Sequence, residues 1–314
     1  MLQLLLRRLA FTIPILVLAS FLVFGLLLLV PGDPAITLAG DNATEEQIEV
    51  IRDRLGLDDP VFVQYGRWAG DAVQGDLGDS LYSGRSVSKS IGERLPVTMS
   101  LAAVSVVIAL LIAIPAGIVA ATRRGTWVDT SATVGASLGL AMPSFWLGAV
   151  LALVFALRLR WLPATGYVPF SESPLDWLRH LILPGLTLGT AAAAETTRQL
   201  RSSLSDVLEQ DYVRTARAAG LRGRTIVWKH SMKNAAMPVV TVLGFQVAFL
   251  LGGSVIVEQL FALPGLGGLA IRAVLDRDIP VIQGVVLFTT ALVVGINLLV
   301  DLLYGWLNPK VRAS

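Results

Sequence analysis

The chain has 314 residues, of which 54% are hydrophobic and 15% are charged, with a mean hydropathy of +0.69. A soluble domain carries about a quarter charged residues, so this composition excludes an ordinary soluble globular protein. The absence of cysteine excludes disulfides, thiol nucleophiles and thiolate metal sites. A formal net charge of +2 is what basic loops beside a membrane produce, so it does not indicate nucleic-acid binding.

Apolar residues collect in blocks of about twenty, the length that crosses a bilayer as an α-helix. The sequence therefore predicts an all-α polytopic membrane protein with six transmembrane helices. The predicted spans are Leu9–Val30, Leu101–Ala121, Leu138–Leu157, Leu181–Ala194, Met237–Ile256 and Val281–Tyr304. The fourth is short and alanine-rich, so we expect it to pack inside the bundle, where small residues let helices approach closely.

Basic residues indicate the orientation of these spans. Lys or Arg occurs before the first span, between the second and third, between the fourth and fifth, and after the sixth. Six spans place these four regions on one side, and the positive-inside rule makes that side cytoplasmic. We therefore expect both termini in the cytoplasm. The connection from Arg158 to His180 also carries three arginines and argues mildly against this orientation.

Three regions follow from this topology. Residues 1–30 form a tail and the first helix, residues 31–100 form an external loop subdomain, and residues 101–314 form a five-helix core. Within the core, a basic cytoplasmic loop covers about residues 205–236. In the external loop, two stretches have apolar residues at helical spacing and predict a small folded subdomain; they are "EEQIEVIRDRLGL" and "DDPVFVQYGRWAGDAVQGDLG".

The sequence contains no motif for chemistry. It has no phosphate-binding G-x-x-x-x-G-K-[ST] loop and no H-E-x-x-H or G-x-S-x-G signature. His180 and His230 are too far apart in sequence to form a ligand pair, so we expect no metal site and no enzyme activity. Uncharged polar residues within the spans either line a translocation path or hydrogen-bond between helices; the path candidates are Gln246, Ser254, Thr289 and Asn297.

A basic, alanine-rich segment runs from Asp211 to Val240 between two apolar runs. Residues 211–219 predict a short helix, with Tyr212, Ala216 and Ala219 along one face and arginines beside it. Asp211 suits the N-cap, and Gly220 suits the left-handed residue that ends a helix. A second helix then runs into the fifth span. The small-residue face suits docking into another protein, although alanine is also simply the best helix former.

The order of residues in this segment resembles a known family. "YVRTARAAGL" (Tyr212–Leu221) is similar to the cytoplasmic EAA-type loop of bacterial ABC importer permeases of the oligopeptide/dipeptide/nickel branch. Agreement extends over nearly the whole chain, through "VPGDPA", "LGLDDPVFVQYGRWAGDAVQGDLGDS", "VEQLFALPGLGGL" and "DLLYGWLNPKVR". Among the departures, Ala219 stands where the family often has lysine, and Asn308 and Lys310 replace a frequent Asp and Arg.

The resemblance implies a type I ABC importer permease fold in a bacterial inner or plasma membrane. It implies half of a translocation path for di- or oligopeptides that works by alternating access. A homologous second permease, two ATP-binding subunits and an extracytoplasmic solute-binding protein would be its partners. This chain would need no cofactor, because the ATP-binding subunits hold ATP and Mg.

The resemblance also implies roles for two groups of residues. The loop would dock into the ATP-binding subunit through Tyr212, Arg214, Thr215, Ala216, Arg217, Ala219 and Gly220. The external gate or binding-protein contact would involve Glu258, Pro264, Gly265 and Gly267. A self-sufficient secondary carrier or channel is the alternative function. Glutathione and nickel chelates remain alternatives to peptides as substrate.

Overall fold

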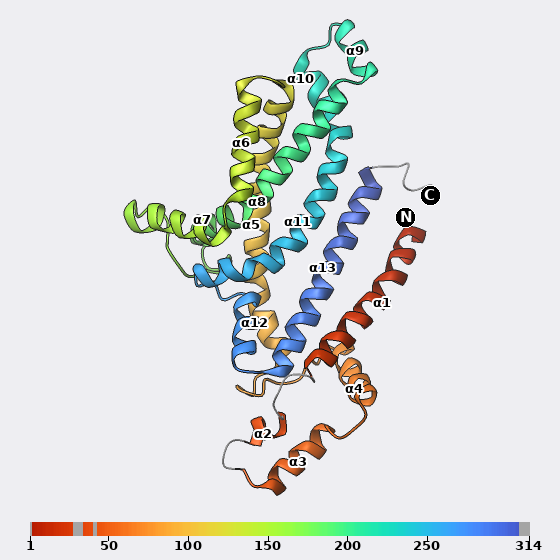
Figure 1. The fold of residues 1–314 in the computed structure, drawn as a ribbon, viewed down its shortest axis with the longest axis vertical. Coiled ribbons are helices and arrows are strands. Elements are labelled where there is room, and N and C mark those ends of the chain that lie inside the picture. Colours follow the sequence, from red (N-terminus) through yellow and green to blue (C-terminus); the bar gives the residue numbers. More distant parts are fainter. Residues whose placement is uncertain (1, 28–33, 40–42, 308–314) are drawn as a thin grey trace. The chain divides into compact units, whose positions relative to one another are not determined.

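The computed structural model describes residues 2–27, 34–39 and 43–307, and its regular elements there are all helical. Figure 1 shows these helices as a ribbon coloured from the N-terminus to the C-terminus. The elements are α1 (Leu2–Leu27), α2 (Pro34–Ala39), α3 (Glu45–Leu55), α4 (Val61–Val73), α5 (Val87–Thr122), α6 (Trp127–Ala141), α7 (Ser144–Leu151), the π-helix η1 (Ala152–Arg158), α8 (Pro174–Leu208), α9 (Asp211–Ala218), α10 (Gly223–Thr225), the π-helix η2 (Ile226–Ser231), α11 (Met232–Leu260), α12 (Leu266–Leu275) and α13 (Ile279–Leu307). The prediction of an all-α chain is confirmed.

Packing divides the chain into two compact units. One comprises Val97–Leu263 together with the chain from Gly295 onward, and the other comprises Leu2–Pro96 with Pro264–Val294. The predicted transition from "VPGDPA" to the external loop and the C-terminal "NPKVR" fall largely outside the described residues. The two units are taken in turn below.

Helix α8 is the centre of the first unit, where it packs against α6, α7 and α11. Its segment Leu181–Ala194 is largely buried, as predicted from its small residues. Gly185 and Gly189 form a G-x-x-x-G spacing, which allows two helix backbones to approach closely. A Cβ at Gly189 would lie 2.7 Å from the carbonyl oxygen of Ser105 on α5. The segment predicted as a short fourth span therefore packs closely against α5.

Gly189→Ala is expected to destabilise the protein, because the added methyl meets backbone that cannot rotate away. Overpacking of this kind costs about 1–3 kcal/mol, which should lower the thermal unfolding temperature of the detergent-solubilised protein. The matched control is Gly252→Ala in α11, where a Cβ would have nothing within 4 Å. That change should be neutral or stabilising, since alanine is the better helix former. Equal effects of the two substitutions would contradict the close α5–α8 contact.

Three helices in the described part are long and apolar enough to cross a membrane: Val87–Thr122, Gly223–Leu260 and Ile279–Val300. A fourth is reached if α6 and the stretch Ser144–Arg158 count together, although they are bent by 102°. The predicted third span, Leu138–Leu157, is thus not one straight helix. Met142 adopts an extended conformation before Pro143, as proline requires of its predecessor, and α6 ends there.

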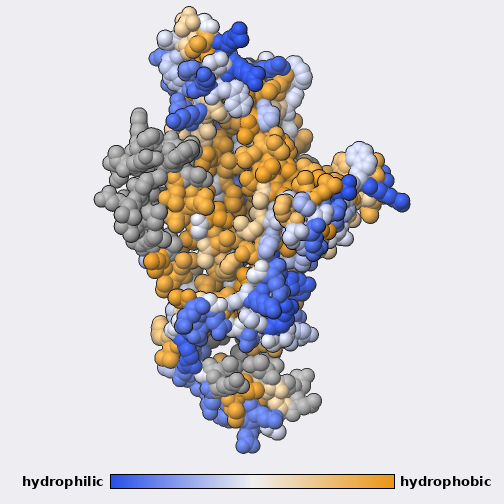
Figure 2. All heavy atoms as spheres, turned by 180° about the vertical axis from the view of Figure 1, so that it is seen from behind, coloured by the Kyte–Doolittle hydropathy of each residue, from blue (hydrophilic) through white to orange (hydrophobic). Residues whose placement is uncertain are grey.

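The surface of the first unit reflects this composition. Large apolar side chains on the long helices are exposed, among them Leu111, Phe245 and Phe249. Figure 2 shows hydrophobic residues over the helical body and hydrophilic residues gathered at the end that carries α9. Contiguous apolar surface on this scale is typical of contact with lipid or with another subunit.

The second unit contains the predicted external helices, and both are found. Helix α3 begins with a capping box between Thr44 and Gln47. Helix α4 packs on α1, where Tyr65 meets the ring of Phe21 edge-on and hydrogen-bonds Ser20 at 2.8 Å. The spacing of apolar residues in this loop was therefore a reliable signal of helix.

A polar clip closes the same unit. Asp278, 5% exposed, accepts a hydrogen bond of 2.5 Å from the hydroxyl of Ser80 and one of 3.1 Å from the backbone N–H of Leu81. A buried carboxylate is tolerated when donors satisfy it in this way. The clip fixes the loop before α5 to the turn before α13.

Candidate functional site

The turn after α9 is locked in one conformation by its backbone. Gly220 has φ +78°, and its N–H donates to the carbonyl of Arg217 at 3.0 Å. The N–H of Leu221 donates to the carbonyl of Ala216 at 3.2 Å. This pair of bonds is the Schellman arrangement, which needs a left-handed residue and favours glycine there. The predicted helix end at Gly220 is confirmed.

The start of α9 differs from the prediction. Gln210 is the N-cap and makes no side-chain capping bond, whereas Asp211 is the first helical residue. The Asp211 carboxylate accepts a hydrogen bond of 3.3 Å from Arg214 instead. An acid in the first turn still favours the helix through the dipole.

One face of α9 holds the helix on its own chain. Val213 is fully buried, and Ala216 is half-buried against the same cluster, which includes Leu204 and Val227. The hydroxyl of Tyr212 accepts a hydrogen bond of 3.1 Å from Asn234 and donates one of 3.3 Å to the carbonyl of His230. These groups fix the orientation of α9 relative to η2 and α11.

The opposite face of α9 is open. Arg214, Thr215 and Ala218 are exposed on it, and Arg217, Ala219 and Gly220 are exposed beside it. The predicted strip of Tyr212, Ala216 and Ala219 therefore runs along the edge between the anchored and the open face. Whether these residues dock into a partner stays a prediction, but the structure shows which of them have free surface.

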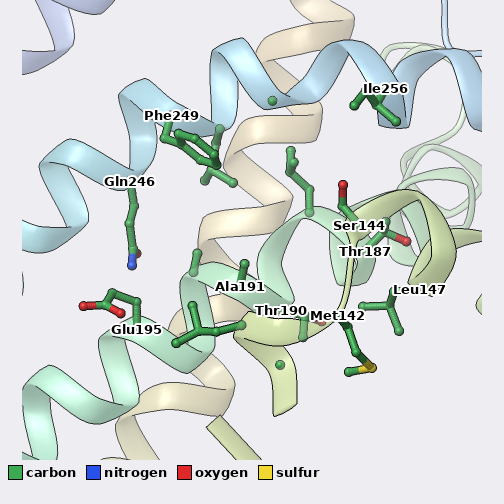
Figure 3. Close-up of a pocket in the computed structure, with 16 residues that line it drawn as sticks. Met142, Ser144, Leu147, Thr187, Thr190, Ala191, Glu195, Gln246, Phe249 and Ile256 are labelled. Carbon is green, nitrogen blue, oxygen red and sulfur yellow. The ribbon is translucent and has the colours of Figure 1, made fainter. Parts of the chain in front are cut away.

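A cavity of about 420 Å³ lies between α6, α7, α8 and α11. Its volume is in the range of small-molecule sites, about 300–1,000 Å³. Most of the lining is apolar, with Met142 from the bend after α6, Leu147 from α7, and Phe249 and Ile256 from α11 (Figure 3). The bend at Pro143 and the small residues of α8 leave the space open.

Polar groups occupy one end of this cavity. Figure 3 shows Glu195 on α8 and Gln246 on α11 extending toward each other. The Thr196 hydroxyl donates to the amide oxygen of Gln246 at 3.0 Å, which leaves the amide N–H₂ group of this lining residue available as a donor. One oxygen of Glu195 accepts a bond of 2.5 Å from Arg198, one turn further along α8. The cavity thus combines apolar walls with an acid and an amide.

Among the predicted path residues, only Gln246 lines this cavity. Ser254 is fully buried and donates to the Leu251 carbonyl at 2.9 Å, and Thr289 donates to the Val285 carbonyl at 2.7 Å. Asn297 lies half-buried in α13 and away from the cavity lining. For Ser254 and Thr289, hydrogen bonding within the protein accounts for the polar group. Their role in a path stays a prediction.

The predicted gate residues are mostly inaccessible within the described chain. Glu258 is 1% exposed, and its Oε1 accepts bonds of 2.7 Å from Thr98 and 3.2 Å from Ser254. Gly265 caps α12 and Gly267 lies in its first turn, and both are buried, whereas Pro264 is exposed. Of these four residues, Pro264 alone is exposed, and their role at a gate or a binding-protein contact stays a prediction.

An ion pair that the sequence did not predict joins α6 to α8. Both carboxylate oxygens of Asp129 accept bonds from Arg201, one of them from Nη2 at 2.8 Å. The backbone N–H of Gly125 donates to the same carboxylate at 3.0 Å. The hydrogen bond to Asp129 raises the pKa of the Arg201 guanidinium. Within the described residues no group of three His, Asp or Glu is arranged to hold a metal.

Sequence reasoning also missed Glu195 as a cavity residue. A signal existed, because Glu195 is the only acid between Asp176 and Asp206. Its spacing from Gln246 carries no information, since the two residues lie on different helices and meet only through tertiary packing.

Comparisons with known proteins identify the family of this chain. The family model described as "Binding-protein-dependent transport system inner membrane component" matches residues 113–313, and a model of the N-terminal part of such membrane components matches residues 1–102. A putative peptide transport system permease protein of Brucella abortus is 46% identical over 99% of each chain. The glutathione transport system permease protein GsiC of Escherichia coli is 44% identical over 99% of each chain.

A solved structure shares the fold. The MetNI methionine ABC transporter in an inward-facing conformation is similar at a TM-score of 0.58 and 17% identity, covering 69% of this chain and 96% of that one. The family models and the full-length relatives confirm the family to which "YVRTARAAGL" and the other motifs are similar. The chain belongs to the binding-protein-dependent transport system inner membrane components, the permease subunits of ABC importers.

Proposed function

We propose that this chain forms half of the translocation path of an ATP-driven peptide importer. The full-length relatives named for peptide and glutathione transport support this substrate class. The cavity beside α8 supports it as well, because apolar walls accept varied side chains while an acid and an amide can bind peptide backbone groups. A homologous second permease would line the other half.

In this proposal α9 is the coupling helix, and its architecture is the observation that carries the assignment. One face is anchored by Val213 and the Schellman turn fixes the end, so a push on the open face is transmitted to α8 and α11. The open face carries Arg214, Thr215 and Ala218. ATP-driven closure of two partner subunits would move this helix and switch the path between inward- and outward-facing states.

The remaining topology belongs to the same proposal. Six spans in a bacterial inner or plasma membrane would place α9 and both termini in the cytoplasm. The loop region 31–100 would then lie outside, where a solute-binding protein delivers substrate, and residues 101–314 would form the permease core with a coupling loop at about 205–236. ATP and Mg would be bound by the partner subunits.

Co-purification and transport test this proposal together. An affinity-tagged chain expressed with its native partners should bring down an ATP-binding subunit and a second permease. Proteoliposomes with this complex should take up radiolabelled dipeptide only when ATP is present on the side of α9 and binding protein on the opposite side. Transport by the purified chain alone, insensitive to ATP, would instead establish the secondary carrier.

A further inference from the structure

We propose that Glu195 recognises the positively charged amino terminus of a peptide in the cavity between α6, α7, α8 and α11. This inference rests on the proposed peptide-import function and adds a specificity residue to it. The substrate class is then narrower than peptides in general, because it requires a free ammonium group at one end.

The surroundings of Glu195 support this role. Its side chain is 37% exposed and borders the cavity, whereas its partner Arg198 is 47% exposed and does not line the cavity. Arg198 bonds to Oε2, so Oε1 of this cavity-lining residue remains available to a ligand. An ammonium group has three donors and no acceptor, and a carboxylate has only acceptors. The two groups are complementary in both charge and hydrogen bonding.

Stability does not account for an acid at this position. An exposed ion pair one turn apart on a helix contributes little, because water screens it and the side chains lose freedom. The neighbouring residues Ala193, Ala194, Thr196 and Thr197 are all buried, so Glu195 is the position on this stretch of α8 that opens toward the cavity. The cavity walls are mostly apolar, so a carboxylate at its edge gains from an arriving cation that replaces lost water.

Gln246 adds a hydrogen-bond donor to the site beside Glu195. Its Oε1 is held by Thr196, so the amide N–H₂ group is oriented and can donate to a peptide carbonyl. The apolar walls at Leu147, Phe249 and Ile256 then lie where side chains would follow. An acid, an oriented donor and an apolar wall match an ammonium, a carbonyl and a side chain.

The test compares uptake of dialanine with uptake of N-acetyl-dialanine, which lacks the ammonium group. The reconstituted importer is used with saturating binding protein, and each variant is scored by the ratio of the two rates. Because the binding protein is the same throughout, its own selectivity cancels when the ratios of variant and wild type are compared. We expect Glu195→Gln to lower dialanine uptake by about tenfold or more, to leave the acetylated peptide unchanged, and so to collapse the ratio.

Arg198→Ala separates recognition from the ion pair. It breaks the same pair but leaves the carboxylate in place, so the preference for dialanine should persist or increase. Glu195→Asp keeps a carboxylate and should retain part of the preference that Glu195→Gln loses. If Glu195→Gln and Arg198→Ala behaved alike, or if both peptides fell equally, recognition by Glu195 would be overturned.

If the binding protein does not deliver N-acetyl-dialanine, equilibrium binding replaces uptake. Each tritiated peptide is bound to the purified importer without binding protein, and the ratio of bound dialanine to bound N-acetyl-dialanine is expected to collapse in Glu195→Gln. Failure of the underlying function looks different, because the wild-type importer would then show no ATP-dependent uptake of either peptide.

Discussion

Replacing Ala218 with tryptophan is expected to abolish ATP-driven uptake while the protein remains folded and inserted. Ala218 is exposed on the open face of α9, opposite the buried Val213. An indole there would meet the surface of the proposed ATP-binding partner, and overpacking costs about 1–3 kcal/mol. That is a loss of roughly five- to 150-fold in affinity for the partner. Uptake and ATPase activity in proteoliposomes should both be measured, since uncoupling separates them.

The control for bulk is Ser202→Trp, at an exposed position on α8 outside α9. It should leave uptake and thermal stability near wild type. Ala216→Trp serves a second purpose, because Ala216 is half-buried against the chain's own cluster. That variant should lower the unfolding temperature as well as uptake. Normal uptake by Ala218→Trp would mean that the open face of α9 does not dock.

The sequence predicted α9 well because the determinants of this helix are local. Gly220 ends it through a backbone conformation that glycine favours, and the run of alanines and arginines before it forms helix readily. Which face is free could not be read from the same residues. The anchoring cluster joins Val213 to Leu204 and Val227 through tertiary packing, and only that contact separates the open face from the anchored one.

The residues that line the cavity were predicted less completely for a related reason. Gln246 was identified because an amide within an apolar run is costly to leave unpaired. Glu195 was visible as an isolated acid, but its position beside Gln246 depends on how α8 crosses α11. The bend of 102° that helps to open the cavity follows from Pro143, whose presence predicts a break in the helix but not its direction.

Asp129→Ala is expected to lower the free energy of unfolding strongly, because it leaves Arg201 without its buried partner. The Asp129 side chain is 6% exposed and satisfies two donors of Arg201 and the N–H of Gly125. Breaking a buried pair costs about 3–5 kcal/mol. Arg201 retains 31% exposure and can recover some water, so we expect about 2–3 kcal/mol here. The unfolding temperature of the solubilised importer measures this loss.

The matched control is Glu209→Ala, which breaks the pair between Glu209 and Arg124. Both of those side chains are more than half exposed, at 67% and 57%, so the change should cost less than about 1 kcal/mol. If the two substitutions lowered the unfolding temperature equally, burial would not be what makes the Asp129 pair important.

A double variant then separates the worth of the pair from the cost of stranding one partner. With Asp129→Leu and Arg201→Met together, no charge is left unpaired, and apolar replacements of buried pairs are often neutral. We therefore expect most of the stability lost in Asp129→Ala to return. Uptake need not return with it. Arg201 lies on α8 next to Leu200 of the cluster that anchors α9, so a pair kept for its geometry would leave the double variant stable but poorly coupled.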